Sequence, residues 1–128
     1  MEYNTLIPEL IVSDIEKAYA FYVDLLGFKV AYDRPEDKFY FLTYGDVQLM
    51  IEEAGEEELN QMAYPFGQGL NFSLGVDDVS AIYQAFQEVG YPIHQELKVR
   101  EFRVGNEVVR PQEFAILDPD GYYWRISD

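Results

Sequence analysis

The stretch VDDVSAIYQAFQEVGYPI, residues 76–93, repeats an earlier part of the chain. A shift of 64 positions, half of the 128 residues, places it on VSDIEKAYAFYVDLLGFKV, residues 12–30. Asp14 then falls on Asp78, and both stretches end in a glycine followed by an aromatic residue, with one residue deleted in the second copy. The repeat predicts a chain built from two similar modules.

Helix signals open each copy. Ser13-Asp14-Ile15-Glu16 has the capping-box pattern, so a helix is expected from there to about Leu26, ending at Gly27. Asp77 or Asp78 is expected to cap the matching helix, which runs to Val89.

Short apolar runs predict the strands. In the first half they lie at 5–13, 28–33, 38–44 and 46–53, with Phe28, Val30 and Tyr32 on one face of the second strand. In the second half they lie at 70–76, as two or three strands through 101–117 with a hairpin at Gly105-Asn106, and after the turn at 118–121. The prediction is an α+β fold of one domain over 1–128: two tandem βαβββ modules, about 1–53 and 69–128, joined by a solvated linker at about 54–68.

Composition restricts the partners. Twenty-four acidic and nine basic residues give a net charge of −15, which repels nucleic acid and anionic membranes. No apolar run approaches the roughly 20 residues that span a bilayer, and the first ten residues lack the pattern of a signal peptide. The absence of cysteine excludes disulfides, thiolate zinc sites and thiol nucleophiles. We therefore expect a cytoplasmic protein that binds neither nucleic acid nor membranes.

Three segments resemble the vicinal oxygen chelate superfamily, which includes glyoxalase I, extradiol dioxygenases and bleomycin-resistance proteins. They are residues 12–30, LGVDDV (74–79) and LDPDGYYWRI (117–126). The resemblance implies that the two modules are curled sheets facing each other around a central cavity, usually with a dimer to complete it.

The enzymes of that superfamily hold a divalent metal with His and Glu side chains from four strands. The resemblance places the corresponding positions at Ile7 or Pro8, Met50, Asn71 and Arg125. A thioether is a poor ligand for hard divalent ions, and a guanidinium cannot ligate a metal. Even if the register slips, the neighbouring carboxylates Glu9 and Glu52 could restore only two of the four sites. We therefore expect no metal, no cofactor and no metal-dependent catalytic residues.

Two further segments are similar to the metal-free bleomycin-resistance branch: IPELIVSD (7–14) and PQEFAILDPDGYYWRI (111–126). Such proteins sequester a bulky, cationic, aromatic drug in grooves of a homodimer. The similarity implies a small-molecule ligand, such as a bleomycin-type antibiotic, and a homodimer with strand-swapped or edge-to-edge modules. Flat aromatic faces and acidic side chains would suit such a ligand.

Strand alternation nominates the residues that line the cavity. The predicted ligand-binding residues are Phe39, Phe41, Gln48, Met50, Glu52, Asn71, Ser73, Glu113, Tyr123 and Arg125. Phe39 and Phe41 serve either as a stacking wall or as core. Trp124 is expected on the opposite face from Tyr123, packed beneath a helix, and His94 on a surface strand. Glu113 and Arg125 are expected to form a cross-strand ion pair.

Three classes of function stay open. The first is a binding protein that sequesters an aromatic, cationic ligand; an anionic or zwitterionic ligand gripped by Arg125 is the alternative. The second is a glyoxalase-like or dioxygenase-like lyase or oxygenase with a non-standard or metal-independent site that uses Glu52 or Glu113. The third is a sensor or structural partner with a vestigial cavity.

Overall fold

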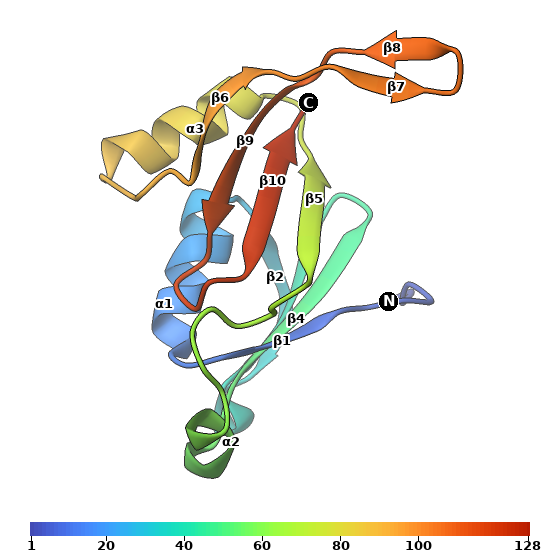
Figure 1. Ribbon diagram of the computed structural model, residues 1–128. Helices are drawn as coiled ribbons and strands as arrows, with labels where there is room; N and C mark the ends of the chain where they lie inside the picture. Colours follow the sequence, from blue (N-terminus) through green and yellow to red (C-terminus); the bar gives the residue numbers. More distant parts are fainter. The chain divides into compact units, whose positions relative to one another are not determined.

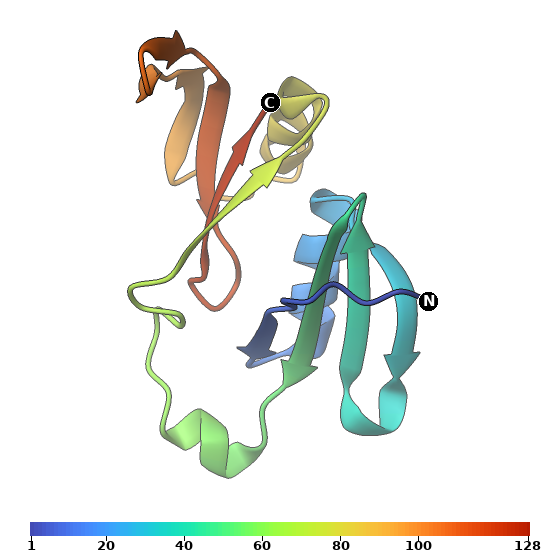
Figure 2. The same ribbon diagram turned by 90° about the vertical axis from the view of Figure 1, so that its right-hand side faces the viewer.

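The computed structural model describes all 128 residues and divides the chain into two compact units, residues 1–64 and 65–128. Each unit contains one four-stranded sheet with helical structure on one side of it (Figures 1 and 2). The predicted α+β class is confirmed.

Unit 1 has the predicted strand order of its module, with four short helical segments. Its elements are β1 Glu9–Val12, α1 Ile15–Tyr19, η1 Ala20–Leu25, β2 Lys29–Arg34, η2 Pro35–Asp37, β3 Phe39–Tyr44, β4 Val47–Glu53 and α2 Glu56–Asn60. The sheet has the order β1-β4-β3-β2, in which β1 pairs with β4 in parallel and the other pairs are antiparallel. The helix α2 lies within the segment predicted to be a solvated linker.

Unit 2 repeats this topology with an insertion. Its elements are β5 Asn71–Gly75, α3 Val79–Glu88, β6 Gln95–Val99, β7 Phe102–Val104, β8 Glu107–Val109, β9 Gln112–Leu117 and β10 Tyr123–Ser127. The sheet order β5-β10-β9-β6 again joins its first and last strands in parallel. The strands β7 and β8 form a separate hairpin around Gly105-Asn106, which extends beyond the four-stranded sheet (Figure 1). The hairpin is confirmed, but the plain βαβββ pattern of the second module omitted the two-stranded sheet.

The two helices begin where the sequence predicts them and differ in length by one residue. The first is capped by Asp14, one residue after Ser13, where the capping-box pattern places the cap, and the second is capped by Asp78, one of the two predicted candidates. The Asp14 carboxylate accepts hydrogen bonds from the backbone N–H groups of Glu16 and Lys17, and Asp78 accepts one from Ala81. In unit 1 the helix continues as the π-helical turn η1, whereas α3 is α-helical throughout. A π turn closes its hydrogen bonds over five residues instead of four and so takes one more residue per turn. It therefore accommodates the extra residue of the first copy.

Each hydrophobic core lies between the sheet and its helix. In unit 1, Tyr22 from η1 and Leu42 and Ile51 from the sheet are fully buried. In unit 2, the Phe114 ring meets Tyr83 and Phe86 of α3 at centroid distances of 5.0 and 6.2 Å. Trp124 is buried on this face and stacks on Phe72 at 4.7 Å, so its predicted orientation away from Tyr123 is confirmed.

A β-bulge contradicts the predicted alternation along β2. The register with β3 shifts between Val30 and Tyr32: Val30 pairs with Leu42, which is in the core, and Tyr32 pairs with Phe41 on the other face. Val30 and Tyr32 therefore point to opposite faces, because the bulge inserts one extra residue between them.

Candidate ligand-binding site

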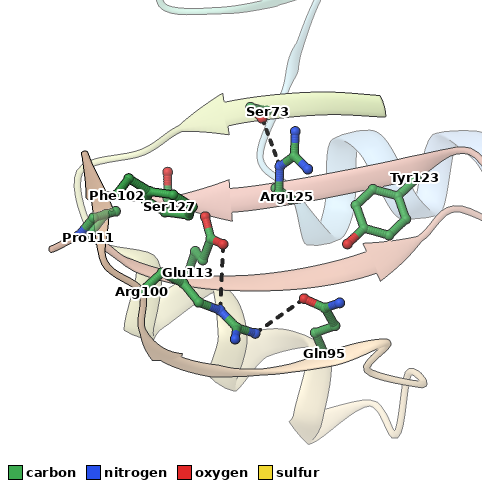
Figure 3. Close-up of a pocket in the computed structure, with 9 residues that line it drawn as sticks. All are labelled: Ser73, Gln95, Arg100, Phe102, Pro111, Glu113, Tyr123, Arg125 and Ser127. Atoms are coloured by element: carbon green, nitrogen blue, oxygen red, sulfur yellow. Dashed lines mark hydrogen bonds and ion pairs between the residues drawn. The ribbon is translucent and has the colours of Figure 1, made fainter. Parts of the chain in front are cut away.

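A pocket of about 660 Å³ lies on the face of the unit 2 sheet that α3 does not cover (Figure 3). Its volume falls within the range of small-molecule sites. Alternation along β10 places Tyr123, Arg125 and Ser127 on this face while Trp124 and Ile126 are buried in the core. The lining residues are Ser73, Gln95, Arg100, Phe102, Pro111, Glu113, Tyr123, Arg125 and Ser127.

Arg125 is held by its neighbours on the sheet. It pairs in register with Ser73 on β5, and its Nε donates a hydrogen bond to Ser73 Oγ at 3.1 Å. Its guanidinium carbon lies 5.9 Å from the centre of the Tyr123 ring. The guanidinium forms no ion pair with any carboxylate of the chain. Arg125 therefore presents an uncompensated positive charge.

The prediction of an ion pair between Glu113 and Arg125 is wrong. In the antiparallel register of β9 and β10, Glu113 lies opposite Ser127, and Arg125 lies opposite Ala115. The carboxylate instead approaches Arg100, whose Nε is 3.6 Å from Glu113 Oε1.

Arg100 is the second cation of the pocket. One terminal nitrogen donates to Gln95 Oε1 at 3.2 Å, and the backbone N–H donates to the Pro111 carbonyl at 2.9 Å. Its Nε is buried without a hydrogen-bond acceptor, because Glu113 Oε1, at 3.6 Å, is too distant to accept from it. Two guanidinium groups and one carboxylate thus face the pocket, a local excess of positive charge in a chain of net charge −15.

The pocket contains four of the predicted site residues: Ser73, Glu113, Tyr123 and Arg125. Asn71 is exposed and pairs in register with Tyr123, outside the lining. Sequence reasoning missed Gln95, Arg100, Phe102, Pro111 and Ser127. Only Ser127 carried a signal, because it is two residues from Arg125 on the same strand.

His94 lies in a bend just before β6 and not on a strand, which corrects the prediction. It is exposed, and its ring meets the Tyr123 ring edge-on at 5.4 Å. Its backbone N–H donates to the Ala115 carbonyl. The ring therefore flanks the Tyr123 end of the pocket without lining it.

The other predicted residues lie on the corresponding open face of unit 1. Phe41 pairs with Met50 and Phe39 with Glu52, so their side chains share that face. Both phenylalanine rings are buried: Tyr32 stacks on Phe41 at 4.9 Å, and the Arg34 guanidinium lies 3.9 Å above Phe39. A ligand on this face would therefore meet Tyr32 and Arg34 before either phenylalanine.

Gln48 fastens the N-terminal segment to the same sheet. Its Oε1 accepts from the Asn4 backbone N–H at 2.7 Å, and its Nε2 donates to the Glu2 carbonyl at 2.8 Å. The Tyr3 ring lies edge-on to Phe41 at 5.6 Å. Both ends of the Gln48 side-chain amide are thus already hydrogen-bonded to the N-terminal segment.

Two carboxylates meet on the unit 1 face. Partial burial raises the pKa of the Glu9 carboxyl, and the nearby Glu52 carboxylate raises it further through charge repulsion and a hydrogen bond. Arg34 partly offsets the rise in the Glu9 pKa. The β1–β4 side of the unit 1 sheet therefore carries a pair of carboxylates, while Tyr32 lies on β2 at the other edge of the sheet.

The donors do not fit a divalent metal of the kind that superfamily enzymes bind. Met50 pairs with Glu9, Asn71 with Tyr123, and Arg125 with Ser73, so strand register brings no second carboxylate or imidazole beside Asn71 or Arg125. No group of three or more His, Cys, Asp or Glu side chains is placed to hold a metal ion.

None of the helices has the length and apolar character needed to cross a bilayer.

Fold, repeat and sequence together define the class of protein. The sequence profile of the Glyoxalase/Bleomycin resistance protein/Dioxygenase superfamily matches residues 5–126, and the chain belongs to this superfamily. Within it, the chain is 28% identical over 124 residues to the bleomycin resistance proteins of Geobacillus stearothermophilus and Staphylococcus aureus, covering 89% of this chain and 88% of theirs. The resemblance seen in the sequence is confirmed.

Solved structures share the fold of this chain. The crystal structure of SMU.1112c is similar with a TM-score of 0.66, 29% identity and 98% coverage of both chains. A bleomycin-binding protein complexed with bleomycin has a TM-score of 0.63 at 22% identity, again over 98% of both chains, which shows a shared fold.

Proposed function

We propose that this chain is a small-molecule binding protein of the bleomycin-resistance type, which sequesters its ligand without turnover. The observation that carries the proposal is the pocket on the unit 2 sheet, where two aromatic rings, two guanidinium groups, a carboxylate and hydroxyl groups converge without a metal-binding donor set. The names of the relatives support bleomycin as the first ligand to test.

A cationic, aromatic ligand would find its counter-charges on unit 1. Glu9 and Glu52 are the acidic pair of that face, and Tyr32 offers a ring for stacking. Stacking on an aromatic side chain contributes roughly 1–3 kcal/mol per ring. Attraction between exposed charges weakens as salt shortens the Debye length, which is about 10 Å at 0.1 M.

Titration calorimetry with metal-free bleomycin at low and moderate salt tests this function. We expect saturable heat that weakens with salt, and unchanged bleomycin recovered by chromatography. Glu52→Gln should weaken binding, whereas Glu57→Gln, an equal loss of charge on the exposed helix α2, should not. Absence of heat at both salt concentrations, together with no protection of host cells, would refute sequestration of bleomycin. Chemically altered bleomycin would refute binding without turnover.

Elemental analysis and a chelator test whether ligand binding is independent of metal. Elemental analysis of gently purified protein should find far less than one Ni, Zn, Fe or Mn per chain, and a chelator should leave ligand affinity unchanged. About one tightly held metal per chain would contradict the proposal.

We also propose that the protein acts as a homodimer. The β7–β8 hairpin exposes Phe102, Val104, Val108 and Val109, and Val99 is exposed beside it. An isolated two-stranded hairpin is only marginally stable, and exposed apolar patches mark interaction surfaces.

Sedimentation velocity at tens of micromolar should show a dimer. Val104→Glu should shift it toward monomer, because a carboxylate would be buried unpaired. A matched charge at an exposed polar site, Gln84→Glu, should not. A wild-type monomer would refute the dimer.

A further inference from the structure

We propose that the pocket on unit 2 selects a planar anionic group, such as a carboxylate, carried by an aromatic ligand and bound through Arg125 and Arg100. The inference rests on the proposed binding function and adds the chemical class of the ligand group at this sheet. It contrasts with the cationic preference expected for the acidic face of unit 1.

The first support is the free end of Arg125. Only its Nε forms a hydrogen bond, to Ser73 Oγ, and among the lining residues in Figure 3 no hydrogen bond or ion pair is drawn to either terminal nitrogen. A planar guanidinium offers paired N–H groups that match the two oxygens of a carboxylate. Because Ser73 fixes Nε, the terminal nitrogens are oriented before the ligand arrives.

The second support is the incomplete compensation of Arg100. Its one carboxylate neighbour is 3.6 Å away, its terminal hydrogen bond goes to the neutral Gln95 amide, and its Nε is buried without an acceptor. Buried donors without partners are rare and costly. An anion in the pocket would supply the negative charge that Glu113 alone does not.

The third support is the remaining lining. Tyr123 and Phe102 lie toward opposite ends of the pocket, with Arg125 and Arg100 between them (Figure 3). The Ser73, Ser127 and Tyr123 hydroxyl groups add neutral hydrogen-bonding partners. A cationic group here would meet two like charges and one carboxylate that already faces Arg100, so electrostatics favour an anion.

Three isosteric probes test the proposal: benzoate, neutral benzamide and cationic benzamidinium. Two-dimensional NMR of the arginine Nε–H groups follows their titration into the full chain. We expect saturable shifts of the Arg125 and Arg100 signals with benzoate, at least about tenfold weaker binding of benzamide, and no saturable shifts with benzamidinium, since a charge-assisted pair is worth roughly a factor of ten or more.

Variants assign the effect. Arg125→Gln should weaken benzoate binding about tenfold. The affinity of Arg125→Lys should lie between those of wild type and Arg125→Gln, because lysine keeps the positive charge but loses the paired N–H donors of the guanidinium. Arg100→Gln should also weaken benzoate. Arg103→Gln is the matched control: it removes one exposed arginine of the hairpin that does not line the pocket, and affinity should stay within about twofold of wild type. Circular dichroism and the urea midpoint show whether each variant is folded.

The outcomes separate this inference from the proposed function. Benzamidinium binding as tightly as benzoate, benzoate binding that survives Arg125→Gln, or no saturable shift up to tens of millimolar would each overturn the anion site. Bleomycin binding in the same samples without benzoate binding would overturn the anion site and leave sequestration standing. Arginine-dependent benzoate binding without bleomycin binding would support the anion site and exclude bleomycin as the ligand.

Discussion

Arg125 and Ser73 lie opposite each other on the parallel strands β10 and β5, and the Arg125 Nε donates a hydrogen bond to Ser73 Oγ at 3.1 Å. The bond leaves the charged end of the arginine available while restricting its orientation. A serine that interacts with an arginine in this way acts on ligand affinity more than on stability.

Ser73→Ala should therefore weaken benzoate binding by about two- to fivefold, because the guanidinium must be ordered when the ligand binds. The urea midpoint should barely change, since the residue is exposed. Ser73→Thr retains the hydroxyl and should restore affinity. Equal affinity for wild type and Ser73→Ala would show that the bond does not orient Arg125 for binding.

The two helix caps should differ in strength. Asp14 accepts two backbone hydrogen bonds and Asp78 accepts one. Loss of a cap costs about 0.5–2 kcal/mol, so Asp14→Ala should lower the free energy of unfolding more than Asp78→Ala. Asp24→Ala removes the same charge from an exposed position in η1 and serves as the control in urea denaturation. The prediction fails if Asp24→Ala is as destabilising as Asp14→Ala.

Gly67 should be far less replaceable than Gly69. Both have positive φ, +70° and +84°, but a Cβ at Gly67 would lie 2.4 Å from the Tyr122 ring, while nothing lies within 4 Å of one at Gly69. Gly69→Ala should cost only the backbone strain, about 1–2 kcal/mol. Gly67→Ala adds a clash with a buried ring, typically 1–3 kcal/mol more. Thermal unfolding of the two variants compares them directly, and equal melting temperatures would contradict the steric argument.

Glu53 should stabilise the fold in a pH-dependent way. The hydrogen bond from Lys38 Nζ at 2.7 Å and a further one from the Ile15 N–H hold the pKa of the Glu53 carboxyl below its usual value, about 4.3. A depressed folded-state pKa gives stability that is fully present above the unfolded value and lost as pH falls through the folded value.

Glu53→Gln should therefore lower the free energy of unfolding at pH 7 by on the order of 1 kcal/mol. The difference from wild type should shrink below about pH 4.3. Urea denaturation measures this difference in unfolding free energy, from pH 7 down to the lowest pH at which both proteins fold. Glu57→Gln is the control. A difference that does not change with pH would point to packing and not to charge.

Much of the fold was predictable because it depends on local signals that occur twice. The capping-box pattern at residues 13–16, the Asp77-Asp78 pair and the apolar spacing after them predicted both helices, although the first cap is Asp14 and not Ser13. The turn residues Gly105-Asn106 predicted the hairpin. The bulge at Val30–Tyr32 was not predictable, because unbroken alternation in the sequence suits an unbulged strand equally well.

The site was predictable only where one strand decides which way a side chain points. Alternation along β10 paired Arg125 with Tyr123 and excluded Trp124. Arg100 reaches the pocket through the pairing of β6 with β9, a long-range contact that no short pattern encodes. The same dependence on register explains the wrong partner for Glu113, which a shift of two residues along β10 would have placed opposite Arg125.

The parallel pairing of first and last strands has a consequence for synthesis on the ribosome. In each unit the last strand, β4 or β10, is an inner strand that joins the first strand to the rest of the sheet. Unit 1 has all four strands once Glu53 has been made, whereas β5 must wait until residues 123–127 emerge before it gains its only neighbour. Nascent chains halted before Tyr123 should therefore carry a protease-resistant first half and an unprotected second half, since domains made first generally fold first.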